Sequence, residues 1–216
     1  MAYQSVSRRR ALGLAAGFGV AAAWRAGPLG AVPLRKVAIL GDSITAGYGL
    51  PQRDALPARL QAELARLGAA VRIVPAGLVG GTTADGIARV DRAVAGGADV
   101  CVVALGGNDL LRGIDPQTVQ ANLRQIVRRL KARGVTVVLA GVQAPPLLRG
   151  GYADAFGAAF ASVARAEGVL FVPDMLAGVT LNPRLNQPDG IHPNAAGVTV
   201  IAKRLAPVVA KGLSAR

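Results

Sequence analysis

The strongest constraint on the fold is a series of five short apolar runs, each separated from the next by a segment of helical length. The runs are residues 37–40, 71–74, 100–105, 135–140 and 169–172. Runs that are apolar almost throughout are typical of strands covered on both faces. Because strands that alternate with helices pair in parallel, the sequence predicts an α/β domain whose parallel sheet carries helices on both faces.

The segments between the runs carry helix signals. Leu56, Leu60 and Leu64 follow helical spacing, and Pro116 takes the first position of another helix, where proline is favoured. The helices are expected over about 55–67, 83–95, 116–133, 152–167 and 195–211. In sheets of this kind ligands bind beyond the carboxyl ends of the strands, so polar residues in the strand-exit loops are the candidates for a site.

Composition excludes several classes of site. The chain has 216 residues, enough for one well-buried domain, with a single cysteine, Cys101, and a single histidine, His192. An intramolecular disulfide, a CxxC motif and a metal site with two histidine ligands are therefore excluded. Four Phe, three Tyr and one Trp are too few for base-stacking platforms, so nucleic acid is not an expected partner.

Residues 1–31 predict an export signal, and residues 32–216 the folded domain. Three arginines, Arg8 to Arg10, precede residues 11–23, which are uncharged and rich in Gly and Ala. This segment is shorter than the roughly 20 residues that span a bilayer. Paired arginines before a weakly apolar segment look like a twin-arginine signal, so we expect a periplasmic or secreted protein. The pattern leaves open the cleavage site and the alternative of an uncleaved anchor.

A serine follows the first apolar run at a sharp turn, in Gly41-Asp42-Ser43. Backbone N–H groups at such a strand-to-helix turn favour negative charge. The other four serines lie in the export signal, in an expected helix or in the C-terminal tail. Ser43 is therefore the candidate nucleophile, and helix capping is the alternative role for this Asp-Ser pair.

Asp189 and His192, just before the last helix, provide the groups that such a nucleophile needs. A serine requires a general base, usually a histidine, whose second ring nitrogen is held by a carboxylate. Asp189 precedes His192 by three residues, and a short turn can bring its carboxylate to Nδ1 while Nε2 points outward. The alternative is a surface histidine that only makes local hydrogen bonds.

Two glycine-rich strand exits offer groups that stabilise a negatively charged oxygen. Gly106-Gly107-Asn108-Asp109 follows the third run, and the Asn108 amide can donate to an oxyanion. The loop over residues 77–83 follows the second run, and a glycine N–H there can be a second donor. Neither loop has the spacing of a phosphate-binding motif. Together with Ser43 and the Asp189–His192 pair, these loops predict acyl transfer.

The motifs ILGDSITAGYG, LGGNDLLRGIDP and DGIHPN resemble those of the SGNH (GDSL-type) hydrolases, over roughly residues 36–211. They look most like the small bacterial periplasmic enzymes with acyl-CoA thioesterase, lysophospholipase and arylesterase activity. The resemblance implies a flavodoxin-like, three-layer α/β/α sandwich with a five-stranded parallel sheet. It also implies a serine esterase or thioesterase that acts on a small-molecule ester without cofactor, metal or obligate protein partner.

The resemblance further implies Ser43 as nucleophile, His192 as base and Asp189 as the residue that orients the base. The oxyanion hole would then combine the N–H groups of Ser43 and Gly80 with the Asn108 side chain. The next residue is Gly81, where the subgroup commonly has an acid, so either glycine can be the donor.

The acyl pocket is less well defined by the sequence. Leu147, Leu148 and Met175 are candidates to line it, with the alternative that they anchor their loops in the core. The loop over residues 145–151 differs from that of the subgroup, so a preference for acyl length does not carry over.

Two other functions remain open. The same catalytic residues would serve a carbohydrate O-acetyl esterase, and a basic face would serve a non-catalytic protein that binds anionic lipid or cell-wall polymers. Residues 32–216 hold 21 Lys and Arg against 12 Asp and Glu, which allows a weak contact with an anionic membrane surface. One expected helix carries a basic cluster, for which a solvated helix face is the simpler explanation: Arg124, Arg128, Arg129, Lys131 and Arg133.

Overall fold

A computed structural model describes residue 1 and residues 34–145 and 150–215. The chain divides between Val32 and Pro33, and the fold reported below lies in the second unit. The predicted export signal falls, except for Met1, outside the described residues. Within the described ranges, no helix is both long enough and apolar enough to cross a membrane.

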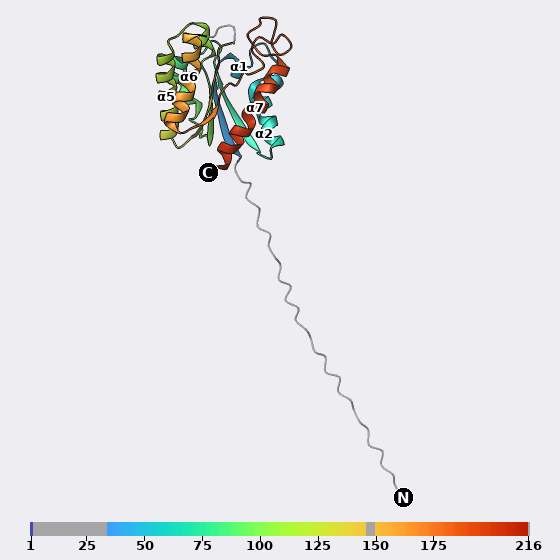
Figure 1. The fold of residues 1–216 in the computed structure, drawn as a ribbon. Coiled ribbons are helices and arrows are strands. Elements are labelled where there is room, and N and C mark those ends of the chain that lie inside the picture. The colour runs from blue at the N-terminus through green and yellow to red at the C-terminus, as the bar shows by residue number, and fades with distance from the viewer. Residues whose placement is uncertain (2–33, 146–149, 216) are drawn as a thin grey trace. The chain divides into compact units, whose positions relative to one another are not determined.

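Five parallel strands form one sheet in the order β2-β1-β3-β4-β5. Figure 1 shows this sheet between two layers of helices, which confirms the expected three-layer α/β/α architecture. Each strand lies where an apolar run predicted it: β1 (Arg35–Gly41), β2 (Val71–Gly77), β3 (Val100–Ala104), β4 (Thr136–Ala140) and β5 (Leu170–Val172).

The five expected helices are also present, with ends that match the expected positions or differ by up to three residues. They are α2 (Leu56–Arg66), α3 (Thr83–Ala93), α5 (Pro116–Ala132), α6 (Gly151–Glu167) and α7 (Ala195–Ser214). Three short elements were not among the predicted ranges, although the sequence predicted a strand-to-helix turn at Ser43: α1 (Ser43–Ala46), η1 (Gln52–Asp54) and α4 (Gly107–Leu111). Elements of three to five residues are too short to show a helical period in the sequence.

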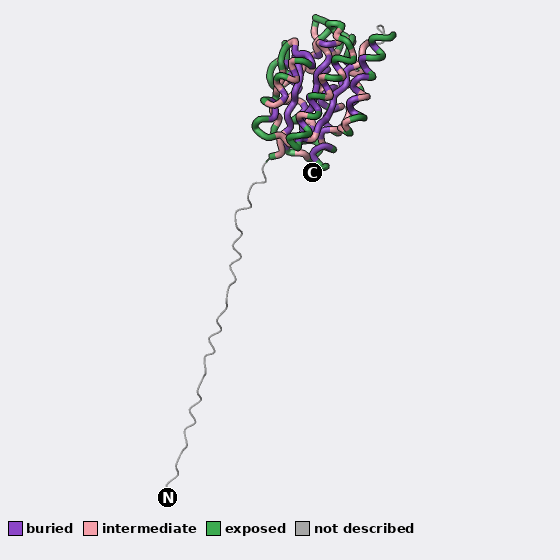
Figure 2. The backbone as a smooth tube through the Cα atoms, turned by 90° about the vertical axis from the view of Figure 1, so that its left-hand side faces the viewer, coloured by how far each residue is buried: buried purple, intermediate pink, exposed green. Residues whose placement is uncertain are grey.

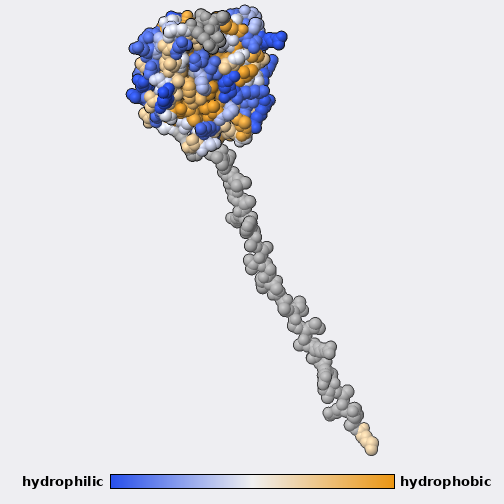
Figure 3. Space-filling model, in the orientation of Figure 1, coloured by the Kyte–Doolittle hydropathy of each residue, from blue (hydrophilic) through white to orange (hydrophobic). Residues whose placement is uncertain are grey.

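The core has two halves because successive residues of a strand face opposite sides of the sheet. Val37 and Ile39 of β1 pack with α2 and α7, whereas Ala38 and Leu40 pack with α3, α5 and α6. Figure 2 shows buried residues running through the middle of this unit and exposed residues outside. In Figure 3, apolar residues form a band down the middle of one face, flanked by hydrophilic residues.

The carboxyl ends of the parallel strands meet at one edge of the sheet, the edge at which Figure 1 shows α1. The loops that follow β1, β2 and β3, together with the long loop that precedes α7, therefore share this end of the fold. These are the segments in which the sequence placed its candidate site residues.

Candidate active site

Ser43 is the first residue of α1 and follows β1 almost directly. Asp42 caps this helix by accepting a hydrogen bond of 3.0 Å from the Ile44 N–H, and Gly47 ends it with a left-handed φ of 76°. A Cβ at Gly41 would lie 2.0 Å from Thr45 Oγ1, so only glycine lets β1 and α1 approach this closely. The turn thus holds the largely buried Ser43 side chain in a position from which its hydroxyl can contact one other side chain.

That neighbour is His192. Its Nε2 lies 3.0 Å from Ser43 Oγ, and its Nδ1 lies 2.7 Å from Asp189 Oδ2. The other carboxylate oxygen, Asp189 Oδ1, accepts hydrogen bonds of 3.0 Å from the N–H groups of Ile191 and His192. The structure therefore joins three side chains from two distant loops in one hydrogen-bonded chain.

Hydrogen bonds keep the Asp189 carboxyl group, which ends the series Ser43–His192–Asp189, in its charged form. The backbone and ring N–H groups of His192, with the Ile191 N–H, lower the pKa of Asp189 to about 2. Asp189 is therefore a carboxylate at neutral pH and accepts hydrogen bonds at both oxygens. Asp42 differs, because burial raises its pKa to about 6 against the lowering effect of the Ile44 N–H.

Contacts from the α1 side fix the loop that carries His192. The Tyr48 ring lies against the His192 ring at a centroid distance of 4.6 Å. Gln187 Nε2 donates to the carbonyls of Tyr48 and Pro193, at 2.8 and 3.0 Å. Neither Tyr48 nor Gln187 was predicted as a site residue, because neither belongs to a spacing pattern that implies the contact.

The two glycine-rich loops are joined to each other. Asn108, in α4, donates from Nδ2 to the Gly81 carbonyl at 3.0 Å, and Arg112 Nη2 donates to the Gly80 carbonyl at 2.9 Å. The Gly81 N–H donates to the Leu78 carbonyl at 2.9 Å, inside its own loop. Gly80 has a left-handed φ of 73°, a conformation that favours glycine.

A buried network below these loops was not foreseen. Asp109, which is 1% exposed, accepts hydrogen bonds from the Thr83 N–H at 3.0 Å and from its hydroxyl at 2.6 Å. Asn122 of α5 donates to the same hydroxyl at 3.0 Å. The network ties α4 to the first residue of α3 and to α5. A threonine and an asparagine within predicted helices carry no sign of such a role.

Arg89 of α3 also connects separate elements, next to the turn between β1 and Ser43. Its guanidinium and Nε donate to the carbonyls of Gly41, Ala76 and Asp85, at 3.2, 2.9 and 3.3 Å. Partial burial lowers the pKa of Arg89 from its ordinary value. The carboxyl ends of β1 and β2 are thereby attached to the helix that begins at the second glycine-rich loop.

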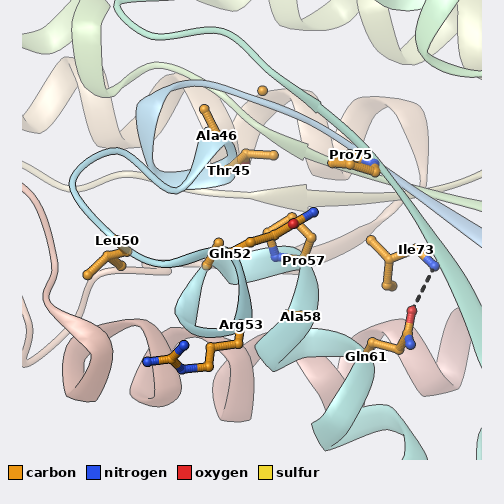
Figure 4. A pocket seen from close by; sticks show the side chains of 12 residues that line it. Thr45, Ala46, Leu50, Gln52, Arg53, Pro57, Ala58, Gln61, Ile73 and Pro75 are labelled. Atoms are coloured by element: carbon orange, nitrogen blue, oxygen red, sulfur yellow. Dashed lines mark hydrogen bonds between the residues drawn. The ribbon is translucent and has the colours of Figure 1, made fainter.

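Of the three residues expected to line an acyl pocket, the structure describes only Met175. Met175 is 3% exposed and belongs to the core half under α2 and α7, which is the loop-anchor alternative. Leu147 and Leu148 lie outside the described residues. A cavity of about 860 Å³ lies between α1, η1, α2 and β2 (Figure 4), but Ser43 and His192 do not line it.

The basic cluster on α5 is engaged by neighbouring helices. Arg124, Arg128 and Lys131 lie within 4.0 Å of Glu167 on α6. Arg129 and Arg133 pair with Asp91 on α3. These side chains connect the helices of one layer while staying partly solvated, which favours the simpler explanation of the cluster over a binding face.

Two further groups bear on cofactors and redox chemistry. Within the ranges that the structure describes, no three His, Cys, Asp or Glu side chains are grouped so as to hold a metal ion. Cys101 is fully buried in β3, and burial raises its pKa to about 12, so it remains a thiol at neutral pH.

Comparison with known proteins gives a consistent picture. The family model for the GDSL-like lipase/acylhydrolase family matches residues 39–200. Esterase TesA of Pseudomonas aeruginosa is 40% identical over 159 residues, which are 73% of this chain and 79% of that protein. Thioesterase 1/protease 1/lysophospholipase L1 of Escherichia coli (strain K12) is 35% identical over 176 residues, 79% of this chain and 83% of that protein. A crystal structure of TesA superposes with a TM-score of 0.77 and 36% identity, covering 81% of this chain and 98% of that chain.

Proposed function

Because the chain belongs to the GDSL-like lipase/acylhydrolase family, whose named relatives are esterases and thioesterases, we propose that it hydrolyses carboxylic esters and thioesters through Ser43, His192 and Asp189. The observation that carries the proposal is the hydrogen-bonded chain from Ser43 Oγ through the imidazole to the Asp189 carboxylate. This is the arrangement that converts a neutral hydroxyl into a nucleophile.

In the first half-reaction, Ser43 Oγ attacks the carbonyl carbon while His192 Nε2 accepts the hydroxyl proton. Asp189 fixes the imidazole tautomer and stabilises the imidazolium that forms. The tetrahedral intermediate then collapses, and His192 gives the proton to the departing alcohol or thiol. In the second half-reaction, water attacks the acyl-enzyme carbonyl in the same way and releases the carboxylic acid and free Ser43.

The negative charge on the carbonyl oxygen needs donors, and we assign these to the N–H groups of Ser43 and Gly80 and to the Asn108 amide. The Gly81 N–H already donates to the Leu78 carbonyl, which favours Gly80 as the donor from this loop. The hydrogen bond from Asn108 to Gly81 supports the assignment, because it holds the two loops that supply these groups side by side.

The substrate class is proposed from the relatives together with the mechanism. Aryl esters, acyl thioesters and lysophospholipids all present a carbonyl next to a leaving group that the His192 imidazolium can protonate. The test is hydrolysis of nitrophenyl acetate, butyrate, octanoate and palmitate by residues 32–216, with Ser43→Ala beside the wild type. We expect turnover that Ser43→Ala reduces to the background rate; equal turnover by both proteins would disprove the role of Ser43.

We also propose that residues 1–31 direct export, on the pattern of arginines before a short, weakly apolar segment. The test is fractionation of cells that express the full chain. We expect the wild type outside the cytoplasm and the double variant Arg8→Lys, Arg9→Lys retained inside it. Export of both proteins alike would contradict the twin-arginine route.

A further inference from the structure

The exposed apolar side chains of the folded unit are not scattered evenly. Leu34 and Leu67 are exposed at the amino edge of the sheet. Tyr152, which is 39% exposed, begins α6 at the carboxyl edge, and six further large apolar residues with exposed fractions from 41% to 65% lie at that edge, on the strand-exit loops or on α4. We call these six the apolar rim: Tyr48, Leu78, Val79, Leu111, Leu181 and Ile191.

Contacts between the loops place the apolar rim around Ser43. On one side, the Tyr48 ring touches His192, and Ile191 is the next residue along the chain. Leu181 and Gly190 line one shallow cavity, which places Leu181 near Ile191. On the other side, Leu78 and Val79 precede Gly80, whose carbonyl is bound by Arg112, the neighbour of Leu111.

Leu181 gives an independent sign that this surface is used. It is the one non-glycine residue with a positive φ in the described part of the chain, at 60°, and it is 55% exposed. A branched side chain in this conformation is strained, and burial within the chain does not offset the strain. Glycine or asparagine would fit the turn better, so an apolar side chain here points to a contact outside the chain.

We propose that the apolar rim inserts into the surface of an anionic phospholipid membrane, so that substrate passes from the lipid to Ser43. The inference rests on the proposed function, because it explains how amphiphilic esters reach the site. A protein bound on this face would cover Ser43, whereas a lipid surface supplies substrate through the same face. The net positive charge of residues 32–216 and the exposed Arg112 and Arg184 on these loops favour anionic headgroups.

The test measures binding without catalysis. Residues 32–216, which contain the whole described fold, are prepared with Ser43→Ala and sedimented with vesicles of phosphatidylglycerol and phosphatidylcholine. Two rim variants, Leu111→Ser and Leu181→Asn, are added separately. We expect each to weaken partitioning by about five- to tenfold, since each removes one apolar side chain from the interface. Leu181→Asn should keep or raise Tm, because asparagine tolerates the left-handed turn, so loss of binding there is not unfolding.

Leu67→Ser is the matched control. Leu67 is 53% exposed, comparable to Leu181, but it follows α2 at the opposite edge of the sheet. The inference is wrong if both rim variants bind like the parent, if Leu67→Ser loses as much binding, or if pure phosphatidylcholine vesicles bind equally well. A dimer in the absence of vesicles that Leu111→Ser dissociates would assign the rim to a second copy of the chain and likewise overturn it.

A kinetic arm separates this inference from the proposed function. In the background that retains Ser43, Leu111→Ser should leave hydrolysis of dissolved nitrophenyl butyrate unchanged and lower hydrolysis of lysophospholipid held in vesicles. If hydrolysis did not depend on Ser43 but vesicle binding still depended on the apolar rim, the proposed esterase function would be wrong and the proposed membrane contact would stand. Equal loss on both substrates would overturn the rim as a lipid contact.

Discussion

For Asn108, a role as oxyanion donor and a role in stabilising the fold can be distinguished by experiment. Its amide makes one hydrogen bond in the structure, to the Gly81 carbonyl, and it is only partly buried. Loss of a single neutral hydrogen bond costs about 1 kcal/mol of stability. Loss of an oxyanion donor costs roughly 2.7–4 kcal/mol in the transition state. The two roles therefore predict effects of different size on different measurements.

We expect Asn108→Ala to lower kcat for nitrophenyl esters by about 10²- to 10³-fold, with a change in Tm of only a few degrees. Asn122→Ala is the control, because Asn122 also donates one hydrogen bond, to Thr83, but is not assigned to the oxyanion hole. Steady-state kinetics give kcat, and thermal unfolding gives Tm, for both variants and for the wild type. An unchanged, wild-type kcat in Asn108→Ala would remove Asn108 from the oxyanion hole.

The sequence predicted the candidate nucleophile, base and orienting carboxylate that the structure brings together, but not the residues that hold them in place. A serine, histidine and aspartate at loop positions are recognisable because few other residues can do their work. Thr83 and Tyr48 have no such signature, since their contacts join segments far apart in the sequence. Met175 shows the converse, because an apolar residue in a loop looks the same whether it lines a pocket or anchors the loop.

At the scale of elements, α1 shows how a short helix is held at a site. It has four residues, too few to be stable by itself, and depends on the Asp42 cap and the glycines at either side. The cap has a cost, because burial raises the pKa of Asp42 to about 6. The unfolded chain releases this proton near pH 4, so the native state loses stability as the pH rises from about 4 to 6.

Asp42→Asn should therefore stabilise the protein at neutral pH, since an asparagine oxygen still accepts from the Ile44 N–H without carrying charge. From the shift, the gain is roughly 2–3 kcal/mol above pH 6, and it should shrink toward zero as the pH falls to about 4. Urea unfolding of both proteins at pH 4, 6 and 8 measures it. A gain that does not change with pH would mean that the cap, and not the charge, is responsible.

At the scale of the whole molecule, local patterns predicted the strands, the long helices and the parallel sheet. Hydrophobic periodicity and helix-capping residues can be recognised from residues close together in the sequence. The strand order β2-β1-β3-β4-β5 did not follow from those patterns, because each crossover can lead to either side of the preceding strand. It is, however, the order of the flavodoxin-like fold that the family resemblance implied. The division of the core into two halves follows instead from the alternation of residues along each strand, and the meeting of the site loops at one edge follows from the strands being parallel.

This arrangement predicts that the position of a core residue along the strand direction decides whether its loss affects catalysis. Phe160, fully buried in α6, lies under the site: a Cβ at Gly106, the cap of α4, would be 2.6 Å from its ring. Leu64 is equally buried in α2, but near the amino ends of the strands. Both are expected to lose stability when truncated to alanine, by about 3–5 and 2–5 kcal/mol respectively, because each leaves a cavity.

Only Phe160→Ala should change the chemistry, because it removes the support of the segment that holds Asn108. Measured well below the Tm of each variant, kcat for nitrophenyl butyrate should fall by about fivefold or more in Phe160→Ala and stay within about twofold in Leu64→Ala, since small displacements of catalytic groups are costly. Equal kcat values in the two variants would show that the loops at the carboxyl edge hold the site without help from the core beneath them.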